Sequence, residues 1–319
     1  MRSRILRGLT LVVGLAAYAG RLEAQGSTGA RESPDSVSGP LIISTAGSLA
    51  GSLTELTAML TKDHPLVVPH QSSRGSVEAA RQAMDSTSVP DVLALADVGI
   101  IPRLLVPQHA TWYAAFARNA MVIAYTEHSA HAAEITAANW PSVLLRRGVR
   151  SGHSDPALDP GGYRARLVFQ LAEKHYREPG LAAHLDSASP TVVPAAGENL
   201  VTMLERGQLD YLIVYRTTAR ERGLRSIELP PEVNLSDPAL SATYATARIR
   251  VSTPGAADST ELRGEPILYG VTIPRRADHQ VTARAFVRAL LSTQGQAILR
   301  KHGFTVPQQP AMHGTPPFP

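Results

Sequence analysis

The sequence predicts an α/β fold made of two doubly wound lobes that are joined by two crossover strands. The chain has 319 residues, which is too many for one ordinary domain and enough for two, each with its own core. With 44% hydrophobic and 18% charged residues, its composition is that of a globular protein and not of a disordered or fibrous one. Short apolar runs alternate with segments of helical periodicity, which is typical of βαβ units in open sheets.

The first strand–turn–helix unit begins at Leu41. Residues 41–44 are apolar and predict a strand, and leucine then recurs at every third or fourth position from Leu49 to Leu60, which marks one face of a helix. A second strand near residues 66–68 leads into the loop 72–76 and another helix. In both units, a loop rich in Ser and Gly therefore stands at the start of a helix.

Three later runs, at 91–97, 121–125 and 211–215, have the nearly continuous apolar character of strands that are buried on both faces. Further strands are expected at 247–251 and 267–273. These runs supply the remaining strands of the two sheets.

The helices that follow these strands are also marked in the sequence. Helical periodicity is expected between residues 126 and 149 and again from 161 to 176. A terminal helix from 281 to 301 is expected to end at Gly303, because glycine commonly terminates a helix at this position.

Five segments are expected along the chain. They are a signal peptide at 1–24, a flexible lead-in at 25–40, a first lobe of 41–119 with 268–304, a second lobe of 120–267, and a Pro-rich surface tail at 305–319. The strands near Met121 and Tyr269 cross between the lobes, so they are expected to act as hinges.

The net charge gives no sign of a polyanionic partner. Four arginines against Glu23 give the first 24 residues a net charge of +3, so the formal total of +4 leaves about +1 for the rest. A nucleic-acid-binding protein would present a strongly basic face. Nucleic-acid binding is therefore not expected.

The N-terminal segment has the layout of a secretory signal peptide. It has an Arg-bearing start, an apolar run at 9–19 that is too short to span a bilayer, and small residues at two cleavage points, after Ala19 or Ala24. A retained membrane anchor is the alternative. The sequence contains no cysteine, which excludes disulfides and an N-terminal lipid-modified cysteine. The expected location of the mature protein is thus the periplasm, where it is soluble and a monomer.

Two patterns in the sequence resemble parts of an enzyme site or a metal site. The segment Gly152-His153-Ser154-Asp155-Pro156 approaches the G-x-S-x-G elbow of serine hydrolases, but a proline replaces the second glycine and obstructs the helix that must follow. His128 and His131 lack the spacing and the third ligand of a zinc site, so solvated histidines are favoured. No enzymatic activity and no cofactor are expected.

The two Ser/Gly loops at Gly47-Ser48 and Gly75-Ser76 are candidates for anion binding. A helix N-terminus presents free backbone N–H groups and the positive end of the helix dipole, and a hydroxyl adds one more donor. Both loops are expected at the carboxyl ends of strands, where α/β sheets bind ligands. The alternative is ordinary N-capping by serine, which needs no ligand.

Several segments of the chain, taken together and in order, resemble a known family. They are Ala46-Gly47-Ser48-Leu49, Arg74-Gly75-Ser76-Val77, 91–97 with Ile101-Pro102, 112–119, Asp159-Pro160-Gly161-Gly162-Tyr163-Arg164, Leu209-Asp210-Tyr211 with Tyr215, and 266–274. This set is similar to the tungstate- and molybdate-binding proteins of ABC importers, which have a type II periplasmic binding fold. The resemblance covers residues 41–304.

The resemblance implies a ligand site and its residues. Hydroxyl donors are implied at Ser48, Ser76 and Tyr215, and two carboxylates near the ligand at Asp159 and Glu198. Candidate backbone donors are Gly47, Gly75 and Gly161. The alternative for Tyr215 is a core tyrosine with a satisfied hydroxyl.

Two carboxylates beside a dianion present an electrostatic conflict, because like charges repel strongly in a desolvated cleft. Either one carboxyl is protonated and donates a hydrogen bond, or Asp159 and Glu198 approach the tungsten or molybdenum and raise its coordination from four towards six, as the resemblance implies. Sulfur and phosphorus do not offer the second option. The implied function is capture of tungstate or molybdate and its delivery to an ABC permease. A binder of sulfate, phosphate or ferric iron, a serine-dependent hydrolase and a sensor module are the alternatives.

Overall fold

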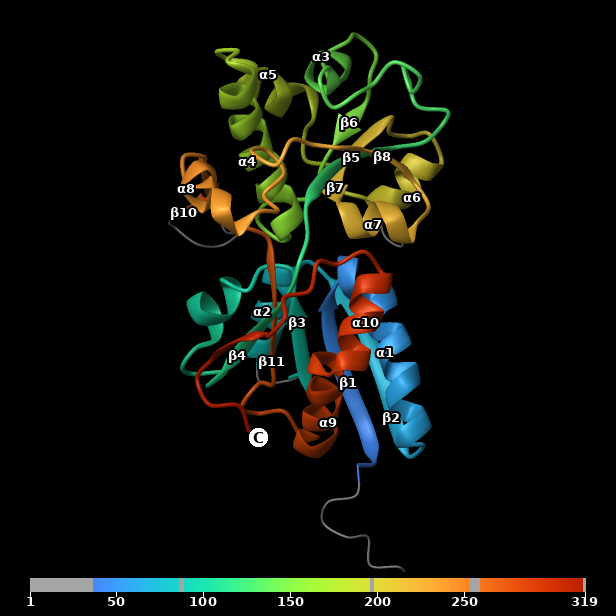
Figure 1. Ribbon diagram of the computed structural model, residues 1–319, viewed down its shortest axis with the longest axis vertical. Coiled ribbons are helices and arrows are strands. Elements are labelled where there is room, and N and C mark those ends of the chain that lie inside the picture. The colour runs from blue at the N-terminus through green and yellow to red at the C-terminus, as the bar shows by residue number, and fades with distance from the viewer. Residues whose placement is uncertain (1–36, 86–88, 196–197, 253–258, 318–319) are drawn as a thin grey trace, which may run out of the picture. The chain divides into compact units, whose positions relative to one another are not determined.

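Two larger β-sheets with their covering helices, and a third sheet of two strands, form the fold (Figure 1). The computed structural model describes residues 37–85, 89–195, 198–252 and 259–317. The predicted signal peptide and most of the lead-in lie outside these residues. The predicted α/β class is confirmed, with one sheet and its helices in each of two lobes.

The first lobe is built on a six-stranded mixed sheet with the order β12-β4-β11-β3-β1-β2. Its strands are β1 Gly39–Ala46, β2 Val67–Arg74, β3 Val92–Leu95, β4 Tyr113–Arg118, β11 Leu268–Thr272 and β12 Ala311–His313. β1 runs parallel to both β2 and β3, whereas β11 lies antiparallel between β3 and β4. A strand from near the C-terminus is therefore part of the core of this N-terminal lobe.

Helices cover both faces of this sheet. They are η1 Gly47–Leu49, α1 Ala50–Asp63, α2 Ser76–Met84, η2 Ile101–Leu105, α9 Gln280–Leu291 and α10 Thr293–Lys301. Figure 1 shows α1, α9 and α10 gathered beside β1 and β2. The predicted apolar helix face is confirmed, because Leu49 at the end of η1 and Leu53, Leu56 and Leu60 in α1 are all buried.

The predicted single terminal helix is wrong, since the chain breaks at Ser292 into α9 and α10. Ser292 has an extended backbone (ψ 165°), and its hydroxyl accepts a hydrogen bond from the Gly295 amide at 3.1 Å. This side-chain cap starts a new helix and competes with continuation of the first. The predicted glycine terminus is confirmed, with Gly303 at φ +90°.

The second lobe is built on a four-stranded sheet with the order β6-β7-β5-β8. Its strands are β5 Met121–Tyr125, β6 Ser151–Gly152, β7 Tyr211–Tyr215 and β8 Arg225–Glu228. Its helices are α3 Trp140–Leu144, α4 Pro160–Tyr176, α5 Leu181–Ala188, α6 Leu200–Glu205 and α7 Arg216–Glu221. The predicted strands at 121–125 and 211–215 and the helix beginning near 161 are confirmed.

The segment 126–149 contains much less helix than the sequence suggested, namely α3 alone. Polar side chains bond the backbone here: Ser129 Oγ accepts from the Thr126 amide, and Asn139 Oδ1 accepts from the Thr136 amide. Such local bonds stabilise turns at the expense of helix.

The irregular part of the second lobe ends in a small hairpin. This part consists of η3 Pro238–Leu240, α8 Ser241–Tyr244, β9 Arg248–Ser252 and β10 Ser259–Arg263, and the antiparallel strands β9 and β10 form the hairpin.

Part of the predicted surface tail is paired with the sheet of the first lobe. β12 lies along β4, and the His313 ring stacks on Tyr113 with centroids 4.5 Å apart.

Two crossings connect the sheets. The chain passes from β4 into β5 through Asn119 and Ala120, and it returns through Ile267 into β11. The two crossings are in contact: the Asn119 backbone amide donates to the Ile267 carbonyl oxygen at 3.3 Å.

Among the residues that the structure describes, no helix is both long and apolar enough to cross a membrane.

Candidate functional site

A pocket of about 790 Å³ is lined by both lobes. The first lobe contributes the carboxyl ends of β1 and β2 with the loops that follow them, and the second contributes the start of α4, the segment before α6 and the junction of β7 with α7. Seven of the eight predicted site residues line this pocket: Gly47, Ser48, Gly75, Asp159, Gly161, Glu198 and Tyr215.

Ser48 stands in η1, directly after β1. Its side chain is nearly buried, and its Oγ lies 2.7 Å from the hydroxyl of Tyr269 on β11. The same Tyr269 hydroxyl also accepts a hydrogen bond from Asn119 Nδ2 at 2.9 Å. The Ser48 loop is therefore held in place by Tyr269 and Asn119, which lie at the two crossings between the lobes.

Gly75 and Ser76 begin α2, and they differ in what they face. The Val77 amide donates to the Leu158 carbonyl oxygen at 3.2 Å, and a Cβ on Gly75 would lie only 2.3 Å from that oxygen. The lobes thus meet here backbone to backbone. Ser76 does not line the pocket: it is fully buried, and its Oγ accepts from the Ala96 amide at 2.9 Å.

Asp159 is the N-cap of α4 and is half-buried. Its Oδ1 accepts from the Gly161 amide at 3.2 Å, and its Oδ2 accepts from the Ser154 hydroxyl at 2.6 Å. Desolvation raises the pKa of Asp159, and these two hydrogen bonds only partly oppose the increase. The protonated form is therefore easier to reach here than in an ordinary aspartate.

Glu198 lies just before α6 and is half-buried at the pocket wall. Its Oε1 lies 3.2 Å from Arg206 Nη1, so in this structure the carboxylate is paired with a cation of its own helical region. A contact between Glu198 and a bound ligand would have to replace or share this ion pair.

Tyr215 ends β7, and its hydroxyl is buried against Arg164. Arg164 Nη1 donates to the Tyr215 hydroxyl at 2.8 Å and to the Ala96 carbonyl oxygen at 2.5 Å, and Arg164 Nη2 lies 3.6 Å from Asp97. A guanidinium has no acceptor, so Tyr215 must accept this bond and direct its own proton elsewhere. Burial raises the pKa of Tyr215 well above its usual value, which keeps that proton in place.

Arg164 was missed as a functional residue, although a signal was present. It precedes Leu167 and Leu171 by three and seven positions, so it falls on the apolar face of α4, where a charged side chain needs a specific partner. In the structure it is buried and bridges the lobes, because Ala96 and Asp97 belong to the first lobe and Tyr215 to the second.

The patterns considered as enzyme or metal sites are arranged differently. The His153 ring contacts the Ser154 carbonyl oxygen, while the Ser154 hydroxyl donates to Asp159. His128 is exposed beside Glu127, and His131 pairs with Glu134 at 3.1 Å. Within the described ranges, no three His, Asp or Glu side chains form a group that could hold a free metal ion.

The charges around the pocket are mainly negative. Its lining contains five carboxylates and two arginines; the carboxylates are Glu78, Asp155, Asp159, Glu198 and Glu221, and the arginines are Arg74 and Arg222. Burial raises the pKa of Glu221 as well as that of Asp159. The two arginines are paired with Glu78 and Glu205, so besides these cations the hydroxyls, the amides and the neutral forms of the acids are the groups compatible with an anion.

Comparison with known proteins decides the family. Residues 41–305 match the family of bacterial extracellular solute-binding proteins. The chain belongs to this family. Because the match includes both lobes and both crossings, it accounts for the whole described fold except the ends of the chain.

Individual members of the solute-binding family agree with this assignment. The chain is 35% identical to a solute-binding protein of Petrotoga mobilis, over 84% of each chain. It is 32% identical to the molybdate/tungstate-binding protein WtpA of Pyrococcus abyssi, over 82% of this chain and 83% of the relative. A molybdate/tungstate-binding protein of Thermococcus kodakarensis is 31% identical, over 97% and 93% of the two chains.

Solved structures share the fold of this solute-binding protein at low identity. The periplasmic molybdate-binding protein of Azotobacter vinelandii matches with a TM-score of 0.61 and 17% identity, over 84% of this chain and 100% of that one. The sulfate-binding protein SubI of Mycobacterium tuberculosis matches with a TM-score of 0.57 and 14% identity, over 85% and 88%. These likenesses support the two-lobed periplasmic binding fold.

Proposed function

We propose that this solute-binding protein is the exported component of an ABC importer, and that it captures tungstate or molybdate in the pocket between its lobes for delivery to a membrane permease. The observation that carries the proposal is the gathering of seven predicted ligand residues, from five separate stretches of sequence, around one pocket. The molybdate- and tungstate-binding names of relatives above 30% identity support the same ligand class.

The donors suit a tetrahedral oxyanion. Ser48 and Tyr215 supply hydroxyls, and the loops at Gly47 and Gly75 supply backbone N–H groups at the starts of η1 and α2; the Gly161 N–H, at the start of α4, would be shared with Asp159, to which it already donates. Donors from both lobes contact the ligand together only when the lobes are closed, so binding stabilises the closed form. The closed form is then the state that the permease recognises.

The two carboxylates are assigned to selectivity. Asp159 and Glu198 either coordinate the metal of the bound oxyanion, or Asp159 is protonated and donates a hydrogen bond. The raised pKa of Asp159 supports the second arrangement, whereas the pairing of Glu198 with Arg206 suits the first. The first arrangement discriminates against sulfate and phosphate, since sulfur and phosphorus in these anions do not expand their coordination.

The first test is titration calorimetry of the mature protein with tungstate, molybdate, sulfate and phosphate. One-to-one binding of the first two alone is the expected result, and no heat from either would refute the proposed ligand class. The double variant Asp159→Ala/Glu198→Ala should lose discrimination against sulfate. Asp155→Ala is its control, because Asp155 also lines the pocket but is not among the predicted ligand residues.

The same titrations separate the two roles of Asp159. In buffers of different ionisation enthalpy, an Asp159 that becomes protonated on binding gives net proton uptake, whereas coordination by a carboxylate that is already ionised gives none. The remaining parts of the proposal are a cleaved signal peptide, a periplasmic location, a monomeric state and the absence of a cofactor. N-terminal sequencing of the exported protein and sedimentation analysis test the first three.

A further inference from the structure

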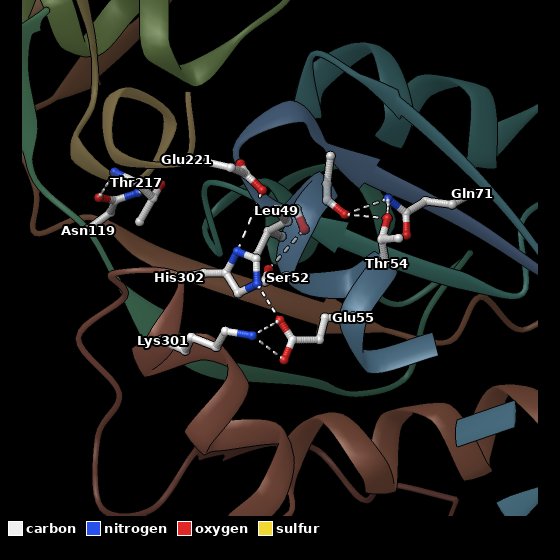
Figure 2. Close-up of polar contacts among 11 residues, drawn as sticks. Leu49, Ser52, Thr54, Glu55, Gln71, Asn119, Thr217, Glu221, Lys301 and His302 are labelled. Atoms are coloured by element: carbon white, nitrogen blue, oxygen red, sulfur yellow. Dashed lines mark hydrogen bonds and ion pairs between the residues drawn. The ribbon is translucent and has the colours of Figure 1, made fainter. Parts of the chain in front are cut away.

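Asn119 occupies the first crossing, between β4 and β5, and is almost completely buried. Its Oδ1 accepts from the amides of Ala120 at 2.9 Å and Thr217 at 3.4 Å. Its Nδ2 donates to Thr217 Oγ1 at 2.7 Å and to the Tyr269 hydroxyl at 2.9 Å. Figure 2 shows Asn119 and Thr217 facing each other.

The orientation of this side-chain amide is fixed by the backbone. The N–H groups of Ala120 and Thr217 can only donate, so the atom that faces them must be the amide oxygen. The amide nitrogen therefore faces Tyr269. Because an NH₂ group has no acceptor, the Tyr269 oxygen must accept from it.

The direction of the next bond follows from the first. The Tyr269 hydroxyl is fully buried, and its only other hydrogen-bond partner among the described residues is Ser48 Oγ at 2.7 Å. Burial raises the pKa of Tyr269 to about 12, so the hydroxyl keeps its proton near neutrality. That proton is donated to Ser48, so the Ser48 proton must point away from Tyr269, and Ser48 is one of the residues that line the pocket.

We propose that Asn119 is a positioning residue that, through Tyr269, makes Ser48 a hydrogen-bond donor toward the pocket. The inference rests on the proposed function and deepens it. A donor of fixed direction favours a ligand oxygen that carries no proton, such as those of molybdate and tungstate. It disfavours a P–OH group of hydrogen phosphate at this position, since two donors would then face each other.

We call the hydrogen-bond chain from Asn119 through Tyr269 to Ser48 the relay. The most direct test reverses the direction of its hydrogen bonds without removing any of them. In Asn119→Asp, Oδ1 still accepts from both backbone amides, but the second oxygen accepts from the Tyr269 hydroxyl. Tyr269 then accepts from Ser48, and the Ser48 proton is withdrawn from the pocket. Molybdate should bind at least about tenfold more weakly at neutral pH, which is the loss of about one hydrogen bond to a charged group.

A buried carboxylate also repels a dianion, so a double-mutant cycle with Tyr269→Phe separates the two effects. Without the phenol, Asn119 is disconnected from Ser48, and the Asn119→Asp substitution should weaken binding clearly less than it does in the wild-type background. An equal effect in both backgrounds would mean that charge alone acts, and it would overturn the proposal. Thr217→Val is the structural control, because it removes a partner of Asn119 and leaves the relay intact.

Tyr269→Phe alone gives a second readout that does not depend on the folding of Asn119→Asp. With the relay cut, the Ser48 hydroxyl can rotate and accept, so the affinity for phosphate relative to molybdate should rise. An unchanged ratio would also overturn the proposal. If the wild-type protein bound neither oxyanion, the proposed function would fall and this inference with it; binding without coupling in the cycle would remove the inference alone.

Discussion

The Gly75→Ala substitution tests whether the observed contact between the lobes belongs to the ligand-bound form. Gly75 has φ −60° and ψ 138°, a conformation that alanine adopts without strain. The added Cβ, however, would lie 2.3 Å from the Leu158 carbonyl oxygen, compared with at least 3.4 Å for an ordinary contact. The lobes would have to separate locally by about 1.1 Å, the difference between these two distances.

This separation also lengthens the bond from the Val77 amide to Leu158, which is already 3.2 Å. Overpacking of this kind costs about 1–3 kcal/mol, which corresponds to about 5- to 150-fold in affinity if the cost falls on closure. The stability of the ligand-free folded protein should not change, because an open arrangement of the lobes relieves the clash. We therefore expect weaker molybdate binding by calorimetry together with an unchanged thermal unfolding temperature of the ligand-free protein.

Gly47→Ala is the matched control for this experiment. Gly47 stands in the other Ser/Gly loop of the pocket, alanine keeps its N–H, and a Cβ there meets no atom within 4 Å. Its affinity should stay close to that of the wild type. If Gly75→Ala bound molybdate within a factor of about two of the wild type, the contact between Gly75 and Leu158 would not belong to the bound form, and the reasoning would be refuted.

Three further predictions concern buried charges. Because the folded-state pKa of Asp159 is raised, the stability that its protonated form contributes is present at low pH and is lost as the pH rises through that pKa. The unfolding temperature of Asp159→Asn, relative to that of the wild type, should therefore be higher at pH 7 than at pH 3. Burial alone would raise the pKa of Asp210, but hydrogen bonds from Arg150 and Ala130 hold it below its ordinary value, so the stability it contributes above that range is lost on acidification. Asp210→Ala should cost about 1–3 kcal/mol in urea unfolding at pH 7 and less at pH 3, and a pH-independent loss would contradict this. Arg164→Met removes the partner of Tyr215 and should weaken oxyanion binding more than tenfold by calorimetry, a loss of more than about 1.4 kcal/mol, whereas an unchanged affinity would show that Arg164 does not orient that hydroxyl.

Local patterns in the sequence predicted much of the fold. The apolar runs at 121–125 and 211–215 became β5 and β7, and the leucine spacing from Leu49 to Leu60 became the buried face of η1 and α1. These features follow from side-chain period and burial within a few residues, so they can be recognised without the partner segments. Where side chains compete with the helix, as Ser292 does, the local pattern alone was misleading.

The family resemblance, and not periodicity, identified the residues of the candidate site. Ser48, Asp159, Glu198 and Tyr215 came from matched segments, and the structure brings all four to one pocket. Ser76 is the exception. Its hydroxyl is buried against the Ala96 amide, and this depended on how α2 packs against β3.

What the sequence determined about this protein by itself is its class, the order of its elements and the loops that carry candidate ligand groups. The tertiary structure decided how these groups are directed. Ser48, Asn119 and Tyr269 are 221 residues apart at their extremes, yet they form one hydrogen-bonded relay. Its direction is set by two backbone amides, which pairing of β5 with β7 brings together, and by burial of Tyr269, which requires β11 to be inserted between β3 and β4. Both depend on pairing between distant strands, which is a property of the whole chain.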